Sequence, residues 1–241
     1  MNEIRLNKYI SDKGLCSRRE ADTAISNGLV LVNEKIASLG DKISSSDKVI
    51  FKGKAIETTN DKVYLAFNKP IGITCTTEHK IAGNIIDYIN YPKRIFPIGR
   101  LDKPSEGLIL LTNDGDIVNK ILRAGNNHEK EYLVWVNKKI NNEFISSMKN
   151  GVSILGTCTK PCKIYRENDT LFRIILTEGL NRQIRKMCAV FDYKVIKLKR
   201  IRIMNIPLDL KTGKWRYLTP SEINEINHLI GSSIKTEEAS R

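Results

Sequence analysis

The chain has 241 residues, of which 41% are hydrophobic, and carries a formal net charge of +13 with a mean hydropathy of −0.30. These values fit a soluble protein with one large or two small domains and a polyanionic partner, because clustered Lys and Arg side chains bind phosphates with release of counterions. No apolar stretch is long enough to span a bilayer and no apolar leader opens the chain, so we expect a cytoplasmic protein without membrane association.

The first thirty residues predict two short helices. In residues 6–10, apolar side chains recur at i, i+3 and i+4, which is the pattern of one helix face, and Gly14 is placed to end that helix. Residues 17–20, Ser-Arg-Arg-Glu, form a capping box. A second helix is therefore expected to begin there and to end at Gly28.

Two short strands, at residues 30–35 and 48–51, are expected to complete this first module before a polar, charged junction. We expect one domain over residues 3–60 and a second over residues 62–230. Residues 231–241 are rich in Ser, Lys and Glu, which predicts a flexible tail.

The second domain is predicted to consist mainly of strands, at residues 63–68, 108–111, 130–136 and 171–177, with a short helix near residues 144–148. Strands and helices do not alternate regularly, as they do in a parallel sheet. The expected fold class is therefore α+β, with a mostly antiparallel mixed sheet and flanking helices.

The most informative segment is residues 99–115, Gly-Arg-Leu-Asp-Lys-Pro-Ser-Glu-Gly-Leu-Ile-Leu-Leu-Thr-Asn-Asp-Gly. It places one carboxylate, Asp102, on a loop that leads into the buried strand at 108–111. Catalytic residues are often held on loops fixed by a core element. A lone Arg-Leu-Asp would be read as a surface turn, but the complete run favours a catalytic acid.

A tyrosine, Tyr132, occupies the predicted strand within Lys-Glu-Tyr-Leu-Val at residues 130–134. Alternate residues of a strand face opposite sides, so this side chain faces either the core or a site. By itself the pattern is typical of a half-buried structural tyrosine.

Residues 178–188, Glu-Gly-Leu-Asn-Arg-Gln-Ile-Arg-Lys-Met-Cys, predict a helix that begins at Arg182 with Asn181 as its N-cap. Arg182 and Arg185, three residues apart, are expected to share one ridge of this helix. The neighbouring core face is formed by Ile184, Met187, Cys188 and Phe191.

The positive charge is concentrated near the C-terminus, where residues 179–216 contain eleven Lys or Arg and two acids. In residues 194–203 the apolar alternation shifts phase between Leu198 and Ile201, which predicts a bulge near Lys199 and Arg200. Basic side chains along this strand would suit contact with an RNA backbone.

The first module resembles an S4 RNA-binding domain through its segments Arg-Leu-Asn-Lys-Tyr-Ile, Ser-Arg-Arg-Glu-Ala-Asp and Gly-Leu-Val-Leu-Val-Asn. The segments around Asp102, Tyr132 and Arg185 resemble, in the same order, those of the RsuA-type ribosomal RNA pseudouridine synthases. The resemblance covers nearly the whole chain and is strongest to the branch that acts on 23S rRNA. One departure is Ser105-Glu106, where many relatives have Thr-Ser.

The resemblance implies isomerisation of a uridine to pseudouridine, without a cofactor or metal. In that family the acid at the Asp102 position is the nucleophile, the tyrosine at Tyr132 stacks on the base, and the arginine at Arg185 pairs with the acid. The implied partner of this monomer is 23S rRNA, either free or within an assembly intermediate of the large subunit. The basic residues expected to bind RNA are Arg5, Lys8, Arg18, Arg19, Arg100, Lys130, Arg182, Lys186, Lys197, Lys199 and Arg200.

Three alternatives stay open from the sequence. A non-catalytic S4-domain factor would explain the charge, and a pseudouridine synthase could act on tRNA or 16S rRNA instead. An RNA N-glycosidase would need a second carboxylate beside the glycosidic bond, for which Glu106 is the nearest candidate. The five cysteines and three histidines lack the spacing of a disulfide framework or a metal site.

Overall fold

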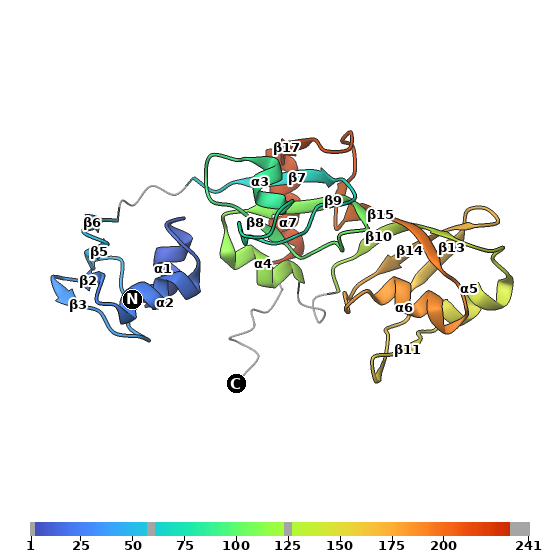
Figure 1. The fold of residues 1–241 in the computed structure, drawn as a ribbon, viewed down its shortest axis with the longest axis horizontal. Helices are drawn as coiled ribbons and strands as arrows, with labels where there is room; N and C mark the ends of the chain where they lie inside the picture. The colour runs from blue at the N-terminus through green and yellow to red at the C-terminus, as the bar shows by residue number, and fades with distance from the viewer. Residues whose placement is uncertain (1–2, 57–60, 123–126, 232–241) are drawn as a thin grey trace. The chain divides into compact units, whose positions relative to one another are not determined.

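The computed structural model describes residues 3–56, 61–122 and 127–231, which form two compact units. The first contains the described residues up to Val63 together with 91–95 and 113–115, and the second contains the others (Figure 1). Among the described helices, none is long and apolar enough to cross a membrane. The predicted tail lies outside the described residues, apart from Gly231.

Two helices form one side of the first unit, α1 (Leu6–Asp12) and α2 (Arg18–Ser26). The predicted capping box is confirmed: the Ser17 hydroxyl accepts from the amide of Glu20, and the Glu20 carboxylate accepts from the amide of Ser17 at 2.7 Å. These contacts satisfy amides that have no partner within the helix, which fixes where α2 begins.

The strands of the first unit form two small sheets. Asn33 and Glu34 both have positive φ, 48° and 68°, and make the tight turn between two of the strands. One sheet pairs β1 (Ile4–Arg5) with β4 (Lys42–Ile43), and the other has the order β3 (Lys35–Ile36), β2 (Val30–Val32), β5 (Val49–Phe51), β6 (Lys54–Ala55).

The second unit is built on one large sheet, whose main strand order is β13-β14-β10-β15-β9-β7-β17. Every pairing in it is antiparallel except that between β9 and β15, which confirms the predicted α+β class. Its strands are β7 (Tyr64–Lys69), β8 (Phe96–Ile98), β9 (Glu106–Thr112), β10 (Lys130–Val136), β13 (Lys163–Arg166), β14 (Leu171–Leu176), β15 (Val195–Ile203), β16 (Ile206–Pro207) and β17 (Trp215–Tyr217). A separate hairpin joins β11 (Ser153–Ile154) to β12 (Thr157–Cys158).

Five helices flank this sheet, with α4 and α7 beside the β7–β9 half and α5 and α6 beside the β10–β14 half (Figure 1). They are α3 (Ile85–Ile89), α4 (Gly115–Leu122), α5 (Asn142–Lys149), α6 (Gln183–Val190) and α7 (Pro220–Leu229). Buried side chains from α4 and α7, among them Ile117 and Ile226, form one core with Leu108 and Leu110 of β9. This packing fixes β9 as an interior strand of the sheet, between β15 and β7.

Strand β9 and the bulge of β15 position the site. Leu108–Leu111 are at most 1% exposed, as predicted for a buried strand. On β15, Arg200 lies opposite Tyr132 and Arg202 lies opposite Glu131, so the residue between them is the extra residue of a β-bulge. The phase shift in the sequence therefore marks a real bulge.

Candidate active site

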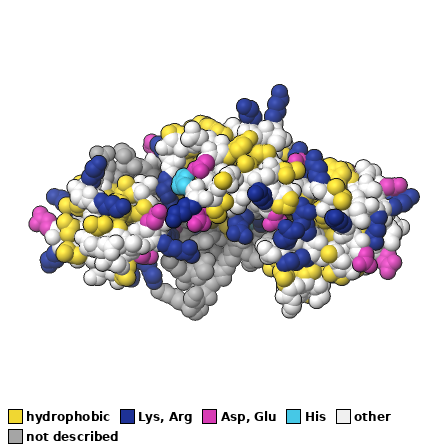
Figure 2. Space-filling view, viewed as in Figure 1, with side chains coloured by type: hydrophobic (Ala, Val, Ile, Leu, Met, Phe, Trp, Pro, Cys, Tyr) yellow, Lys and Arg dark blue, Asp and Glu magenta, His cyan; other side chains and the backbone are white. Residues whose placement is uncertain are grey.

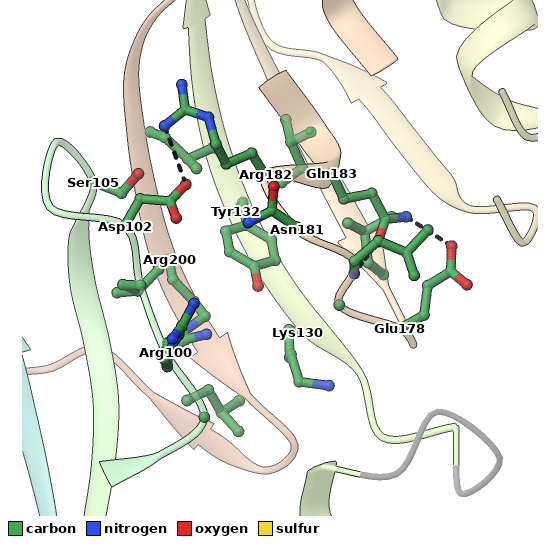
Figure 3. Close-up of a pocket in the computed structure, with 18 of the residues that line it drawn as sticks. Arg100, Asp102, Ser105, Lys130, Tyr132, Glu178, Asn181, Arg182, Gln183 and Arg200 are labelled. Carbon is green, nitrogen blue, oxygen red and sulfur yellow. Dashed lines mark hydrogen bonds and ion pairs between the residues drawn. The ribbon is translucent and has the colours of Figure 1, made fainter. Parts of the chain in front are cut away.

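A pocket of about 400 Å³ opens in the second unit, within the size range of sites that hold small molecules or single nucleotides (Figure 3). It is bounded by the loop that contains Asp102, by β10 and β15, and by the segment that leads into α6. The Asp102 side chain is one-third exposed at this pocket. It can therefore meet a nucleotide that enters from solvent.

Asp102 is held from both sides by the segment that follows β7. The amide before it, at Leu101, donates to the sulfur of Cys75 at 3.4 Å, and the carbonyl after it, at Lys103, accepts from the amide of Gly72 at 2.9 Å. Fixed backbone on both sides limits the positions that the carboxylate can take, and preorganisation of this kind favours catalysis.

Lys69 shapes that supporting segment from inside the protein. Its side chain is completely buried, and Nζ donates to the carbonyl oxygens of Pro70 at 2.8 Å and Ile73 at 2.9 Å. Burial lowers the pKa of Lys69, while the charges of Cys75 and Asp102 oppose this shift. A supporting role for Lys69 was not predicted from the sequence, although the turn Lys-Pro-Ile-Gly at the end of a strand could have indicated it.

Arg182 makes the ion pair that the structure shows for Asp102, with 3.9 Å between Nη1 and Oδ2 (Figure 3). The predicted helix start is wrong, because α6 begins at Gln183 and Arg182 has left-handed backbone angles of φ 51° and ψ 35°. Asn181 does not cap the helix: its side-chain oxygen accepts from Nζ of Lys186 at 2.9 Å. The left-handed turn points Arg182 towards the acid instead of along a helix ridge.

Gln183 stabilises this unusual turn, a role that no pattern in the sequence indicates. Its side-chain oxygen accepts from the amide of Leu180 at 3.0 Å, and its side-chain nitrogen donates to Glu178 at 2.7 Å. Both Gln183 and Glu178 are buried. A non-glycine residue in the left-handed region is strained, so these bonds are needed to hold Arg182 there.

Arg185 holds the loop that follows Asp102. Its Nη1 donates to the carbonyl of Val195 at 3.0 Å, and its Nη2 contacts the hydroxyl of Ser105 at 3.3 Å. The expected direct pairing with Asp102 is thus not the contact that the structure shows, because these groups already engage the guanidinium. Burial lowers the pKa of Arg185, the charge of Arg182 lowers it further, and the charge of Asp102 raises it.

Tyr132 lies on the pocket wall where the sequence places it, in the middle of β10. Its side chain is only 8% exposed, and the guanidinium carbon of Arg200 lies 5.9 Å from the ring centroid. The ring is therefore within the cavity that would receive a base, with its hydroxyl directed into the pocket (Figure 3).

The basic side chains of β15 do not form the continuous RNA-contacting row that the sequence predicts. Arg200 is only 3% exposed and lines the pocket, as does the buried Lys130, so neither lies on the outer surface. Lys197 is exposed and pairs with Glu106, with 3.0 Å between Nζ and Oε1. Arg200 is buried because it lies two residues after Leu198, on the same pocket-facing side of β15, and opposite Gly107 of β9.

The other predicted RNA-binding residues differ in exposure. Lys8 pairs with Asp12 at 2.9 Å within α1. Figure 2 shows Lys and Arg side chains gathered over the region where β15 and α6 lie in Figure 1. Arg5, Arg18, Arg19, Arg100 and Arg182 are exposed, whereas Lys186 and Lys199 are half-buried.

Comparison with known proteins agrees with this architecture. The RNA pseudouridylate synthase family matches residues 63–190, and the S4 domain matches residues 4–49. A solved structure described as a pseudouridylate synthase superposes with a TM-score of 0.69 and 30% identity, covering 92% of this chain and 99% of that one.

Curated relatives cover nearly the whole chain. The dual-specificity RNA pseudouridine synthase RluF of Salmonella typhi is 56% identical over 232 residues, which are 95% of this chain and 80% of the relative. RluF of Escherichia coli K12 is 55% identical, over 96% of this chain and 81% of the relative. The ribosomal large subunit pseudouridine synthase B of Bacillus subtilis is 33% identical, over 93% of this chain and 96% of the relative.

The second unit thus combines a loop aspartate, two arginines and a buried tyrosine around one pocket, within the sequence range that the synthase family matches. The first unit contains the range that the S4 domain matches. The chain belongs to the RNA pseudouridylate synthase family and carries an N-terminal S4 domain.

Proposed function

We propose that this enzyme isomerises a specific uridine of 23S rRNA to pseudouridine, with Asp102 as the nucleophile. The observation that carries the proposal is the position of Asp102, at the pocket opening beside Arg182 and across from Tyr132. The relatives are named for RNA pseudouridine formation, and one of them for the large ribosomal subunit.

The reaction requires the target uridine to leave its stack and enter the pocket. The N1–C1′ bond breaks, the base turns, and a C5–C1′ bond forms. The proton on C5 leaves to solvent and N1 gains a proton, so the composition of the nucleoside does not change. Asp102 would form a covalent bond either to C1′ of the ribose or to C6 of the base, and that bond would break again before the product leaves, which regenerates the carboxylate.

The neighbouring residues would position the base and the nucleophile. Tyr132 would stack on the base, while Arg182 would pair with the Asp102 carboxylate and Arg185 would hold the loop that follows it. Glu106 is engaged by Lys197 and does not line the pocket, and the other carboxylate that does, Glu178, is buried and accepts hydrogen bonds from Gln183 and the amide of Lys160, which disfavours the two-carboxylate arrangement of an N-glycosidase.

Residues 3–60 would act as the S4 RNA-binding domain and residues 62–230 as the catalytic domain of a cytoplasmic monomer. Arg5, Arg18 and Arg19 are exposed and available to RNA phosphates. The substrate would be 23S rRNA, either free or within a large-subunit assembly intermediate.

Mapping of pseudouridines in a deletion strain tests the substrate. We expect one site in 23S rRNA to lose its pseudouridine and to regain it when the wild-type gene is restored, but not when the Asp102→Asn gene is. The same mapping of 16S rRNA and tRNA checks the other RNA classes, which the dual-specificity names of the relatives make relevant. An unchanged 23S rRNA would contradict the proposal.

A further inference from the structure

Two buried cations face the pocket without an acidic partner among the residues that the structure describes. Lys130 is 7% exposed and Arg200 is 3% exposed, and both line the cavity. Among the described residues, the ion pairs of the structure include neither of them. Burying a cation is unfavourable unless an opposite charge or several hydrogen bonds compensate it.

Within the described part of the chain, the hydrogen bonds of Lys130 and Arg200 do not fully offset the cost of burying their charges. Arg200 donates through Nε to the carbonyl of Leu108 at 2.7 Å, but its Nη2 is buried without a partner. Nζ of Lys130 has three protons to donate and makes one long bond, 3.2 Å to the carbonyl of His128. The two side chains therefore retain donors for a group that enters the pocket.

The arrangement around Tyr132 indicates where that group would lie. In Figure 3, Arg200 and Lys130 lie on either side of the space below the Tyr132 hydroxyl, and Arg100 reaches the same region. Asp102 and Arg182 lie at the other end of the ring. A nucleotide with its sugar at Asp102 would thus place another of its groups between the cations.

We propose that Lys130 and Arg200 form a phosphate subsite that binds a backbone phosphate of the uridine held in the pocket. This inference rests on the proposed function, because it assumes that a nucleotide enters this pocket. Two buried cations facing one space favour a charged acceptor over a base carbonyl, since only an opposite charge offsets the cost of burying both of their charges. The subsite would hold the sugar in place while the base detaches and turns.

Binding of mononucleotides to the full-length protein tests the subsite without any turnover. Uridine, 5′-UMP, 3′-UMP and inorganic phosphate are titrated separately and followed by NMR. We expect one of the two nucleotides to bind about tenfold or more tightly than uridine, the effect expected for a hydrogen bond to a charged group. Nucleotide binding no tighter than uridine, or phosphate alone binding equally tightly, would overturn the proposal.

Lys130→Met removes the charge while keeping the length of the side chain. This variant should lose the preference for the nucleotide over uridine, and Lys130→Arg should restore most of it. Lys194→Met is the matched control, because Lys194 is exposed and does not line the pocket. A preference that survives in Lys130→Met, or that disappears equally in Lys194→Met, would contradict the assignment.

Two further measurements separate this role from a structural one. Lys130→Met should melt at the wild-type temperature or above, because a buried uncompensated cation destabilises the fold. Uridine 5′-(dimethyl phosphate), which is uncharged, should bind the wild type no better than uridine does. Tight binding of this neutral compound would overturn the subsite whether or not the variants fold. Because none of these measurements depends on pseudouridine formation, their outcome is independent of the mapping experiment.

Discussion

Gly107 and Arg200 lie opposite each other in the parallel pair of β9 and β15, with no room for a side chain between them. A Cβ on Gly107 would collide with the carbonyl oxygen of Arg200 and lie 2.7 Å from its nitrogen. Gly107 also has φ 109°, a conformation that L-residues rarely adopt. This close contact joins the strand that follows Asp102 to the strand that supplies a pocket arginine.

Gly107→Ala should therefore separate the two strands. We expect the free energy of unfolding to fall by about 3 kcal/mol or more, as for severe overpacking combined with backbone strain. Urea denaturation of the purified protein measures this. Gly156→Ala is the control, since Gly156 also has positive φ but faces open space, and it should lose only about 1 kcal/mol. Equal losses in both variants would show that backbone conformation alone is responsible.

Glu106→Gln should preserve pseudouridine formation. Glu106 pairs with Lys197 outside the pocket, so its carboxylate has no access to the reacting bond. We expect kcat within about threefold of wild type and a loss of at most about 1 kcal/mol in stability, because Lys197 is half-exposed and such pairs contribute little. A loss of kcat as large as that of Asp102→Asn would mean that Glu106 takes part in the chemistry.

Arg182 and Arg185 should have separable effects. Arg185→Gln removes the contacts with Ser105 and Val195, and we expect kcat to fall by about 100-fold or more with little change in RNA affinity. Arg182 is half-exposed and pairs with Asp102, so Arg182→Gln should lower kcat and, unlike Arg185→Gln, should also weaken RNA binding and reduce the slope of log K against log salt concentration by about one. Single-turnover kinetics and binding at several salt concentrations distinguish the two, and identical profiles would contradict this division.

Lys130 should also give the stability a characteristic pH dependence. Burial lowers the pKa of Lys130 from 10.5 to about 8, and the charge of Arg200 adds to this shift. Between these pH values the unfolded chain binds a proton that the folded protein does not, so the free energy of unfolding rises with pH, by up to about 1.4 kcal/mol per unit. The destabilisation is complete below pH 8 and is relieved as the pH rises towards 10.5.

The difference in unfolding free energy between wild type and Lys130→Met, measured in urea from pH 7 to 10.5, isolates this contribution. Other groups titrate in both proteins and cancel in the difference. Above pH 8 we expect the free energy of unfolding of the wild type to rise relative to that of the variant. A constant difference would show that Lys130 is not buried as a cation.

Much of the fold follows from local patterns in the sequence. The Ser17 capping box, the buried run of β9 and the phase shift in β15 each predict the element that the structure contains. These features depend on neighbouring residues only. For the same reason, the position of Asp102 on a loop before a core strand could be predicted.

The site itself depends on contacts that local patterns do not encode. Nothing near Arg182 in the sequence indicates a left-handed turn, because the bonds of Gln183 to Leu180 and Glu178 that hold it form only in the folded segment. Similarly, the burial of Arg200 follows from its place opposite Gly107, which is 93 residues away in the chain. The charge pattern of the sequence therefore predicted, wrongly, that Arg200 lies on the surface.

The most direct test of the proposed reaction is tritium release from 5-tritiated uridine in a 23S rRNA transcript, with wild type and Asp102→Asn compared at equal concentration. We expect release by the wild type, pseudouridine in the product without free uracil, and no release by Asp102→Asn. Absence of release by the wild type on free transcript and on large-subunit precursor particles would contradict the enzymatic assignment. Equal release by both proteins would contradict the role of Asp102.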